Sequence, residues 1–232
     1  MFEKRGLGHV EAILSFVIFI GFLVFAFVFF SPFESGRTLT SSLDYTWREV
    51  SGFSEVNLEI YSIYITSTNS VVAIAIPGAP NNMNAAVEDK NGGVIASYTD
   101  LSGNVHFAKP ANNFVRIKFG PDFMRGNQIT GIPLTAIDYT VSSSETREIF
   151  SEKRILELKN RYENDYSALR TEFNLPNRVH FGFASVLSGG TEISASREVP
   201  ENAEVLSKND RVAVVRIPSG VIEYAEARVF VW

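Results

Sequence analysis

The amino-acid sequence predicts an α+β protein: an N-terminal transmembrane helix, a β-sandwich-like unit, and a C-terminal unit of one long helix on an antiparallel sheet. Three observations predict this fold class. The uncharged apolar stretch Ala12–Phe30 has the length that crossing a bilayer requires. Between residues 56 and 141 apolar residues recur with period two, as in half-buried strands. After residue 142 the period becomes that of a helix, and after Pro176 it returns to two.

The apolar stretch predicts a single-pass anchor. At about 1.5 Å per residue its nineteen residues span roughly 28 Å, and no polar face interrupts them. The stretch is longer than a secretory h-region and no Ala-x-Ala site follows it. Lys4 and Arg5 precede it, so we expect a cytoplasmic N-terminus, membrane lipid as a partner, and the bulk of the chain outside the cell membrane.

Glu11 stands at the head of this stretch, where a carboxylate costs free energy unless it has a partner. A cut between Gly6 and Leu7 would give Leu7 a new ammonium group four residues ahead of Glu11. On a helix those two positions share a face, and opposite charges there lower each other's desolvation cost.

The arrangement Lys4-Arg5-Gly6, Leu7, Glu11 and Ala12–Phe30 resembles the class III signal peptide of type IV pilins and their archaeal relatives. In that family a basic residue and Gly precede the cut, and Glu is the fifth mature residue. The archaeal variant has Gln first and Ser third after the cut, where this chain has Leu7 and His9. The resemblance covers only the first thirty or so residues. It implies a leader peptide at 1–6, a pilin-like helix at 7–31, and two kinds of partner, a prepilin-type peptidase and other pilin-like subunits.

Residues 32–55 are predicted to form a hinge and a short helix. Pro32 and Gly36 break the chain, and Leu39, Leu43, Trp47 and Val50 then recur at helical spacing. Tyr45 and Trp47 have two interpretations: aromatic anchors at a membrane interface, or part of the apolar face that packs on the domain.

Residues 56–141 are predicted to form a β-rich, sandwich-like domain. The segment Asp89–Gly93 is a hairpin-turn signal between two of its short strands. The predicted strands are Val56–Ile65, Val71–Ile76, Ala85–Glu88, Val94–Tyr98, Val105–Ala108 and Phe114–Phe119.

Residues 142–232 are predicted to form an α+β domain, with a helix at 144–174 and strands over 178–232. Ser142 and Glu145 fit a capping box, and Leu175-Pro176 ends the helix. Its apolar stripe either packs on the adjoining sheet or forms a coiled-coil seam; the stripe is Ile155, Leu158, Tyr162, Tyr166, Leu169 and Phe173.

The composition excludes several classes of function. The net charge of −5 argues against a nucleic-acid surface, and the absence of cysteine excludes disulfides and thiol chemistry. His9, His106 and His180 lack ligands at metal-binding spacing, so we expect no metal, no cofactor and no catalytic residues. The sequence thus predicts a structural protein, not an enzyme.

The function that the resemblance implies is a pilin-like subunit, major or minor, of a type IV pilus-like surface filament or its assembly machine. Lys4, Arg5, Gly6 and Leu7 would form the processing site, and Glu11 would act in assembly. The alternative is a permanently anchored surface protein whose β domains bind a protein or glycan. A membrane-tethered enzyme is the third hypothesis, and nothing in the sequence favours it.

Overall fold

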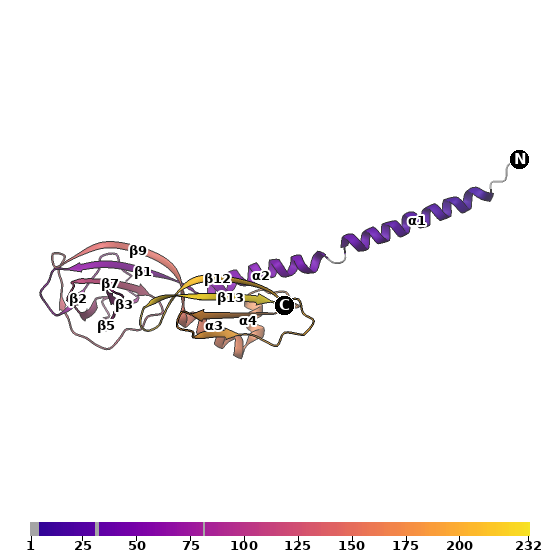
Figure 1. Ribbon diagram of the computed structural model, residues 1–232. Coiled ribbons are helices and arrows are strands. Elements are labelled where there is room, and N and C mark those ends of the chain that lie inside the picture. The colour runs from indigo at the N-terminus through magenta and orange to yellow at the C-terminus, as the bar shows by residue number, and fades with distance from the viewer. Residues whose placement is uncertain (1–4, 31–32, 81) are drawn as a thin grey trace.

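The computed structural model describes residues 5–30, 33–80 and 82–232, with side chains from residue 11 to 26 and from residue 39 onward except residue 81. The fold is mixed α/β and mainly β, with more residues in strands than in helices. Figure 1 shows two β units side by side, with an N-terminal helix that extends away from them. The N-terminal half of the β structure forms one unit and the C-terminal half forms the other.

The helix α1 (Arg5–Phe30) corrects the first part of the predicted fold class. Within the described residues, no helix is both long and apolar enough to cross a membrane. The predicted transmembrane helix is therefore wrong. Its described side chains run from Glu11 to Ala26, about 24 Å at 1.5 Å per residue, whereas a hydrocarbon core is about 30 Å thick.

The second helix, α2 (Phe33–Ser54), is longer than the predicted short helix, while the Ser31-Pro32 part of the predicted hinge lies outside the described residues. The apolar stripe of α2 packs on the C-terminal unit, where Leu43 and Val50 are buried and Leu39 and Trp47 lie against the core. Strand β1 (Glu55–Ile65) begins where α2 ends. The helix therefore leads without a linker into a central strand of the fold.

One nine-stranded sheet runs through both β units, with the strand order β11-β10-β13-β12-β9-β1-β7-β3-β4. It is antiparallel except where β12 (Leu206–Val215) meets β9 (Tyr139–Ser151) at Val214–Phe150 and Val215–Ser151. The other strands are β3 (Asn84–Asp89), β4 (Val94–Ile95), β7 (Phe114–Gly120), β10 (Phe181–Leu187), β11 (Glu192–Ala195) and β13 (Ile222–Val231).

The N-terminal unit is a two-sheet arrangement. Four strands in the order β5-β6-β2-β8 form a second sheet that faces β1, β7 and β3. Ile63, Ile117, Val72 and Phe107 from the two sheets meet in one core and are fully buried. The four strands are β2 (Val71–Ile74), β5 (Ser97–Thr99), β6 (Val105–Ala108) and β8 (Ile132–Pro133).

The long helix predicted at 144–174 is wrong over residues 144–151. Residues 139–151 form β9, which pairs along its length with β1. The capping box predicted at Ser142 is therefore part of a strand. Pairing with β1 outweighs the local capping signal, since most of a short helix's stability comes from tertiary packing.

Two helices replace the rest of that prediction: α3 (Glu152–Asn164) and α4 (Tyr166–Glu172). They break at Asp165, whose carboxylate accepts a hydrogen bond of 3.0 Å from the Ala168 amide. The predicted apolar stripe is buried against the C-terminal sheet, not exposed as a coiled-coil seam. The chain ends tied into this sheet, because His180 and Trp232 exchange two backbone hydrogen bonds.

The two units share a third buried cluster that joins them. Leu58 and Ile60 of β1 contact Phe123, Ile149 and Val215 there. Beside it, the buried carboxylate of Asp122 pairs with Arg154 and Lys153 at the start of α3. The buried residues of this third cluster are Val56, Leu58, Ile60, Ala86, Phe123, Ile149 and Val215. The continuous sheet and this cluster hold the units together.

Candidate functional site

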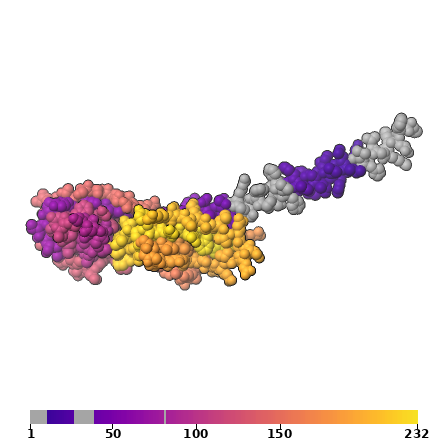
Figure 2. All heavy atoms as spheres, in the orientation of Figure 1, coloured from indigo at the N-terminus to yellow at the C-terminus, as the bar shows by residue number. Residues whose placement is uncertain are grey.

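The helix α1 exposes large apolar side chains on all sides. Of its described residues, Phe16 and Phe22 are 64% and 65% exposed, and the other large apolar side chains are 37% exposed or more. Figure 2 shows the described part of α1 standing clear of the globular part. The exposed set is Ile13, Leu14, Phe16, Val17, Ile18, Phe19, Ile20, Phe22, Leu23, Val24 and Phe25. Isolated helices of this kind expose far more contiguous apolar surface than a monomer normally does.

The predicted processing site lies at the start of this helix. Arg5, Gly6 and Leu7 form the first turn of α1, while Lys4 and the side chains before Glu11 lie outside what the structure describes. Glu11 is exposed, one turn beyond Leu7. The structure thus places Glu11 at the head of the exposed apolar surface, on the same helix as the predicted cut.

Tyr45 and Trp47, the predicted interface aromatics, lie on α2 and pack against the C-terminal core. The ammonium of Lys208 lies 5.7 Å from the centre of the Trp47 ring. Within α2, the guanidinium of Arg48 lies 4.8 Å from the centre of the Tyr45 ring. Lys208 comes from β12 and pairs with Asp44 of α2 at 2.8 Å. The two contacts of Lys208 attach α2 to the globular part.

A second feature, which we call the charged cavity, lies where the two units meet. It has a volume of about 600 Å³, and its polar lining is Ser62, Glu88, Arg116, Lys118, Ser143, Glu145 and Arg147. Strand register explains the set: Ser62 of β1 pairs with Arg116 on one side and Ser143 on the other. Ile60 likewise pairs with Lys118 and Glu145. Because alternate residues share a face, these side chains lie on the side of the sheet opposite the N-terminal core.

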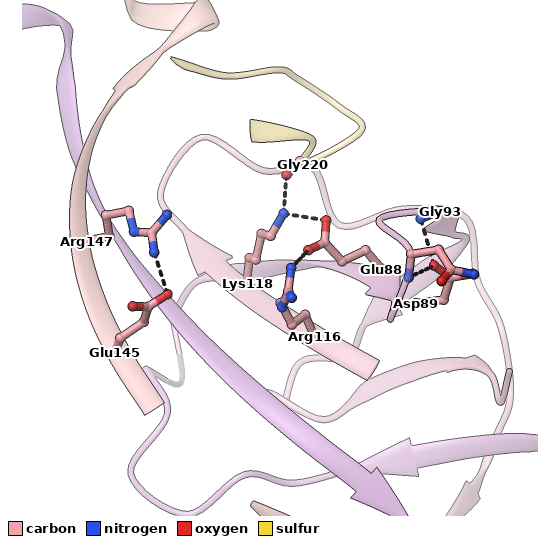
Figure 3. Close-up of polar contacts among 9 residues, drawn as sticks. Glu88, Asp89, Gly93, Arg116, Lys118, Glu145, Arg147 and Gly220 are labelled. Atoms are coloured by element: carbon pink, nitrogen blue, oxygen red, sulfur yellow. Dashed lines mark hydrogen bonds and ion pairs between the residues drawn. The ribbon is translucent and has the colours of Figure 1, made fainter. Parts of the chain in front are cut away.

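The centre of the charged cavity is a buried ion cluster (Figure 3). Glu88 accepts from Lys118 Nζ at 2.6 Å and from Arg116 Nη1 at 3.0 Å. Burial lowers the pKa of Lys118, the charges of Arg116 and Arg147 lower it further, and Glu88 opposes both effects. On β9, which β1 separates from β7, Arg147 donates to Glu145 at 2.8 Å.

Lys118 also joins the two units. Its ammonium donates a hydrogen bond of 2.8 Å to the carbonyl oxygen of Gly220, in the turn between β12 and β13. Gly220 has φ +73°, and a Cβ built there would lie 2.3 Å from the Cβ of Ala86. Glycine is therefore required at this turn for both its backbone angle and its close approach to β3.

Sequence reasoning missed the charged cavity, because its charged and serine side chains come from four strands, β1, β3, β7 and β9, and one wall comes from the C-terminal unit. One signal was present: Arg116 and Lys118 alternate with buried apolar residues in β7, so both charges had to share one face. Burial of Lys118 depends on the C-terminal unit, which no local pattern reveals.

His106 and His180 pack among structural neighbours, and the side chain of His9 lies outside the described residues. His106 Nε2 contacts Asp100 at 3.2 Å and its Nδ1 accepts from the Gly131 amide at 3.1 Å. His180 stacks between the rings of Tyr166 and Trp232. In the part of the chain that the structure describes, no group of three or more His, Asp or Glu side chains is placed to hold a metal ion.

Comparisons with known proteins leave the family open. No protein-family model matches this chain, and neither the curated proteins nor the solved structures gave a match.

Proposed function

We propose that this protein is a pilin-like structural subunit of a type IV pilus-like surface filament, and that α1 packs against copies of itself in the filament core. The observation that carries the proposal is the exposed apolar surface of α1, from Ile13 to Phe25. Each large side chain that becomes buried contributes about 1.5–3 kcal/mol. A bundle of identical helices supplies that burial for every subunit.

Glu11 gives the bundle a register. In the proposed filament the chain is cut between Gly6 and Leu7 by a prepilin-type peptidase. The Leu7 ammonium of one subunit then pairs with the Glu11 carboxylate of a neighbour. In the low dielectric of a helix bundle such a pair is favoured over either charge alone, so it selects one axial offset between subunits.

The globular part suits the exterior of such a filament. Its two cores are separate from α1, and α2 is fixed to the C-terminal unit by its apolar stripe and by the Lys208–Asp44 ion pair. Strand β1 follows α2 directly. A load on α1 would therefore pass through a packed helix into the middle of the nine-stranded sheet.

The test compares filament yield in the native host. Glu11→Ala should reduce the sheared filament fraction strongly while the total amount of protein stays similar. Glu157→Ala is the matched control, because Glu157 is also an exposed glutamate on a helix, α3. Equal filament yields from Glu11→Ala and wild type would remove the proposed role of Glu11. An absence of filaments from wild type under all growth conditions would reject the function itself.

A further inference from the structure

The charged cavity has the size and position of a small-molecule site. Its volume of about 600 Å³ lies within the range of roughly 300–1,000 Å³ that ligand pockets occupy. Ala213, Val221, Ile222 and Tyr224 of the C-terminal unit form one wall, and the sheet of the N-terminal unit forms the other. Ligand sites occur preferentially at such junctions between units.

The charge of the lining favours an anion. Three cationic side chains and two carboxylates line the cavity, so one positive charge is in excess. Glu88 is shared by Lys118 and Arg116, and the remaining carboxylate, Glu145, is half exposed to solvent. A second anion near Arg116 and Arg147 would offset the repulsion among the three cations.

Arg116 and Arg147 each have N–H donors beyond those that bind Glu88 and Glu145. A guanidinium carries five N–H groups, and in the described part of the chain Arg116 uses Nη1 for Glu88 while Arg147 uses Nη2 for Glu145. Both side chains are nearly half exposed, at 45% and 47%. Their remaining N–H groups can bind a carboxylate in the bidentate geometry that arginine favours.

The other lining groups suit a hydroxylated ring. Ser62 and Ser143 present hydroxyls on adjacent strands, in one cross-strand row with Arg116. The ring of Tyr224 lines the cavity and is exposed, with the guanidinium of Arg211 4.5 Å from its centre. Hydroxyls, a carboxylate acceptor at Glu145 and an aromatic face together match a sugar. A nucleic acid would require a larger basic surface, and a metal ion would meet excess positive charge.

We propose that the charged cavity binds an acidic saccharide, with carboxylates at Arg116 and at Arg147 and its hydroxyls at Ser62, Ser143 and Glu145. Lys118 and Glu88 lie behind the ligand and keep the arginine of β7 in place. This proposal is independent of filament assembly, because every residue in it belongs to the globular part.

The experiment measures binding of digalacturonate to the full chain by isothermal titration calorimetry, with a neutral disaccharide and sodium sulfate as comparisons. Digalacturonate should bind at millimolar concentration or below, and the neutral disaccharide should bind far more weakly. Arg116→Gln and Arg147→Gln should each weaken binding about tenfold, the loss expected for one charge-assisted hydrogen bond. Arg178→Gln, which changes an exposed arginine outside the cavity, should bind as wild type does.

A second readout does not depend on the variants. Amide chemical shifts of wild type should change on addition of digalacturonate at Ser62 and Ser143, and not in α3. Three results would overturn the proposal: no digalacturonate binding by wild type, equal binding of the neutral disaccharide, or shift changes confined to other surfaces. Sulfate that binds as tightly as digalacturonate would also overturn it, since the site would then recognise a bare anion.

Discussion

Lys118 Nζ lies 2.6 Å from Glu88 Oε2, and both side chains are buried, at 4% and 9% exposure. Lys118 also donates a hydrogen bond to the carbonyl of Gly220, and Glu88 also accepts one from Arg116. The pair therefore connects β3, β7 and the β12–β13 turn. The two removals differ in their consequence. When Lys118 is removed, Glu88 still has a second cation, Arg116.

Glu88→Gln should destabilise the protein more than Lys118→Met does. The first leaves a buried ammonium without its carboxylate, a change that costs about 3–5 kcal/mol. The second leaves Glu88 still paired with Arg116, so the loss should be smaller. Urea unfolding of the two variants measures the difference. A greater loss for Lys118→Met would contradict this account of the cluster.

Gly220→Ala should cost more stability than Gly190→Ala. Both glycines have a positive φ, +73° and +80°, which costs a non-glycine residue about 1–3 kcal/mol. A Cβ at Gly190 meets nothing within 4 Å, whereas at Gly220 it would lie 2.3 Å from Ala86. Thermal unfolding of the pair isolates the steric contribution. Equal melting temperatures would show that β3 and the β12–β13 turn do not meet as described.

Asp100 should contribute to acid stability. Partial burial opposes its ionisation, but hydrogen bonds from Asn104, His106 and Ser102 lower its pKa to about 2, from the ordinary 3.8. This contribution is complete above pH 3.8 and is lost as the pH falls towards 2, since the unfolded chain takes up the proton first.

The measurement is thermal stability of wild type and Asp100→Asn across this pH range. The difference between them should shrink as the pH falls below 4, to a few tenths of its neutral value. A difference that is the same at pH 7 and pH 2 would show that the Asp100 charge plays no part.

The mature N-terminus should be Leu7. Because Gly6 is the residue before the proposed cut, Gly6→Leu should leave the precursor intact in cells that contain the peptidase. Mass spectrometry of protein from the native host gives both results directly. A wild-type chain that retains residues 1–6, or a Gly6→Leu chain that begins at Leu7, would contradict the processing proposal.

The sequence predicted several elements well, for physical reasons that are local. The stripe from Ile155 to Phe173 is buried on a sheet, and the turn Asp89–Gly93 joins β3 to β4. The Asp89 carboxylate accepts from the amides of Asn91 and Gly93 at 2.8 Å, so this turn is encoded by the residues within it. Periodicity and turn chemistry need no distant partner to act.

The elements that were predicted wrongly depend on distant partners. Residues 142–148 carry a helix-capping pattern but form a strand, because they pair with the edge of β1. The continuity of the sheet depends on the short pairing of β12 with β9, which involves two positions of β9, Phe150 and Ser151. The charged cavity likewise exists only after four strands and the C-terminal turn have come together. Apolar length alone also gave the wrong prediction for α1, which the described residues do not support as a membrane span.

The central claim, that α1 packs on copies of itself, is tested most directly by disulfide cross-linking. The chain has no cysteine, so single cysteines report one position each. Gly21 on α1 and Gly189 in the β10–β11 turn are both exposed, and a Cβ at either meets nothing within 4 Å. After mild oxidation of material from the native host, Gly21→Cys should yield cross-linked dimers, and Gly189→Cys should yield far fewer. Monomeric Gly21→Cys, or equal cross-linking at the two positions, would contradict the account.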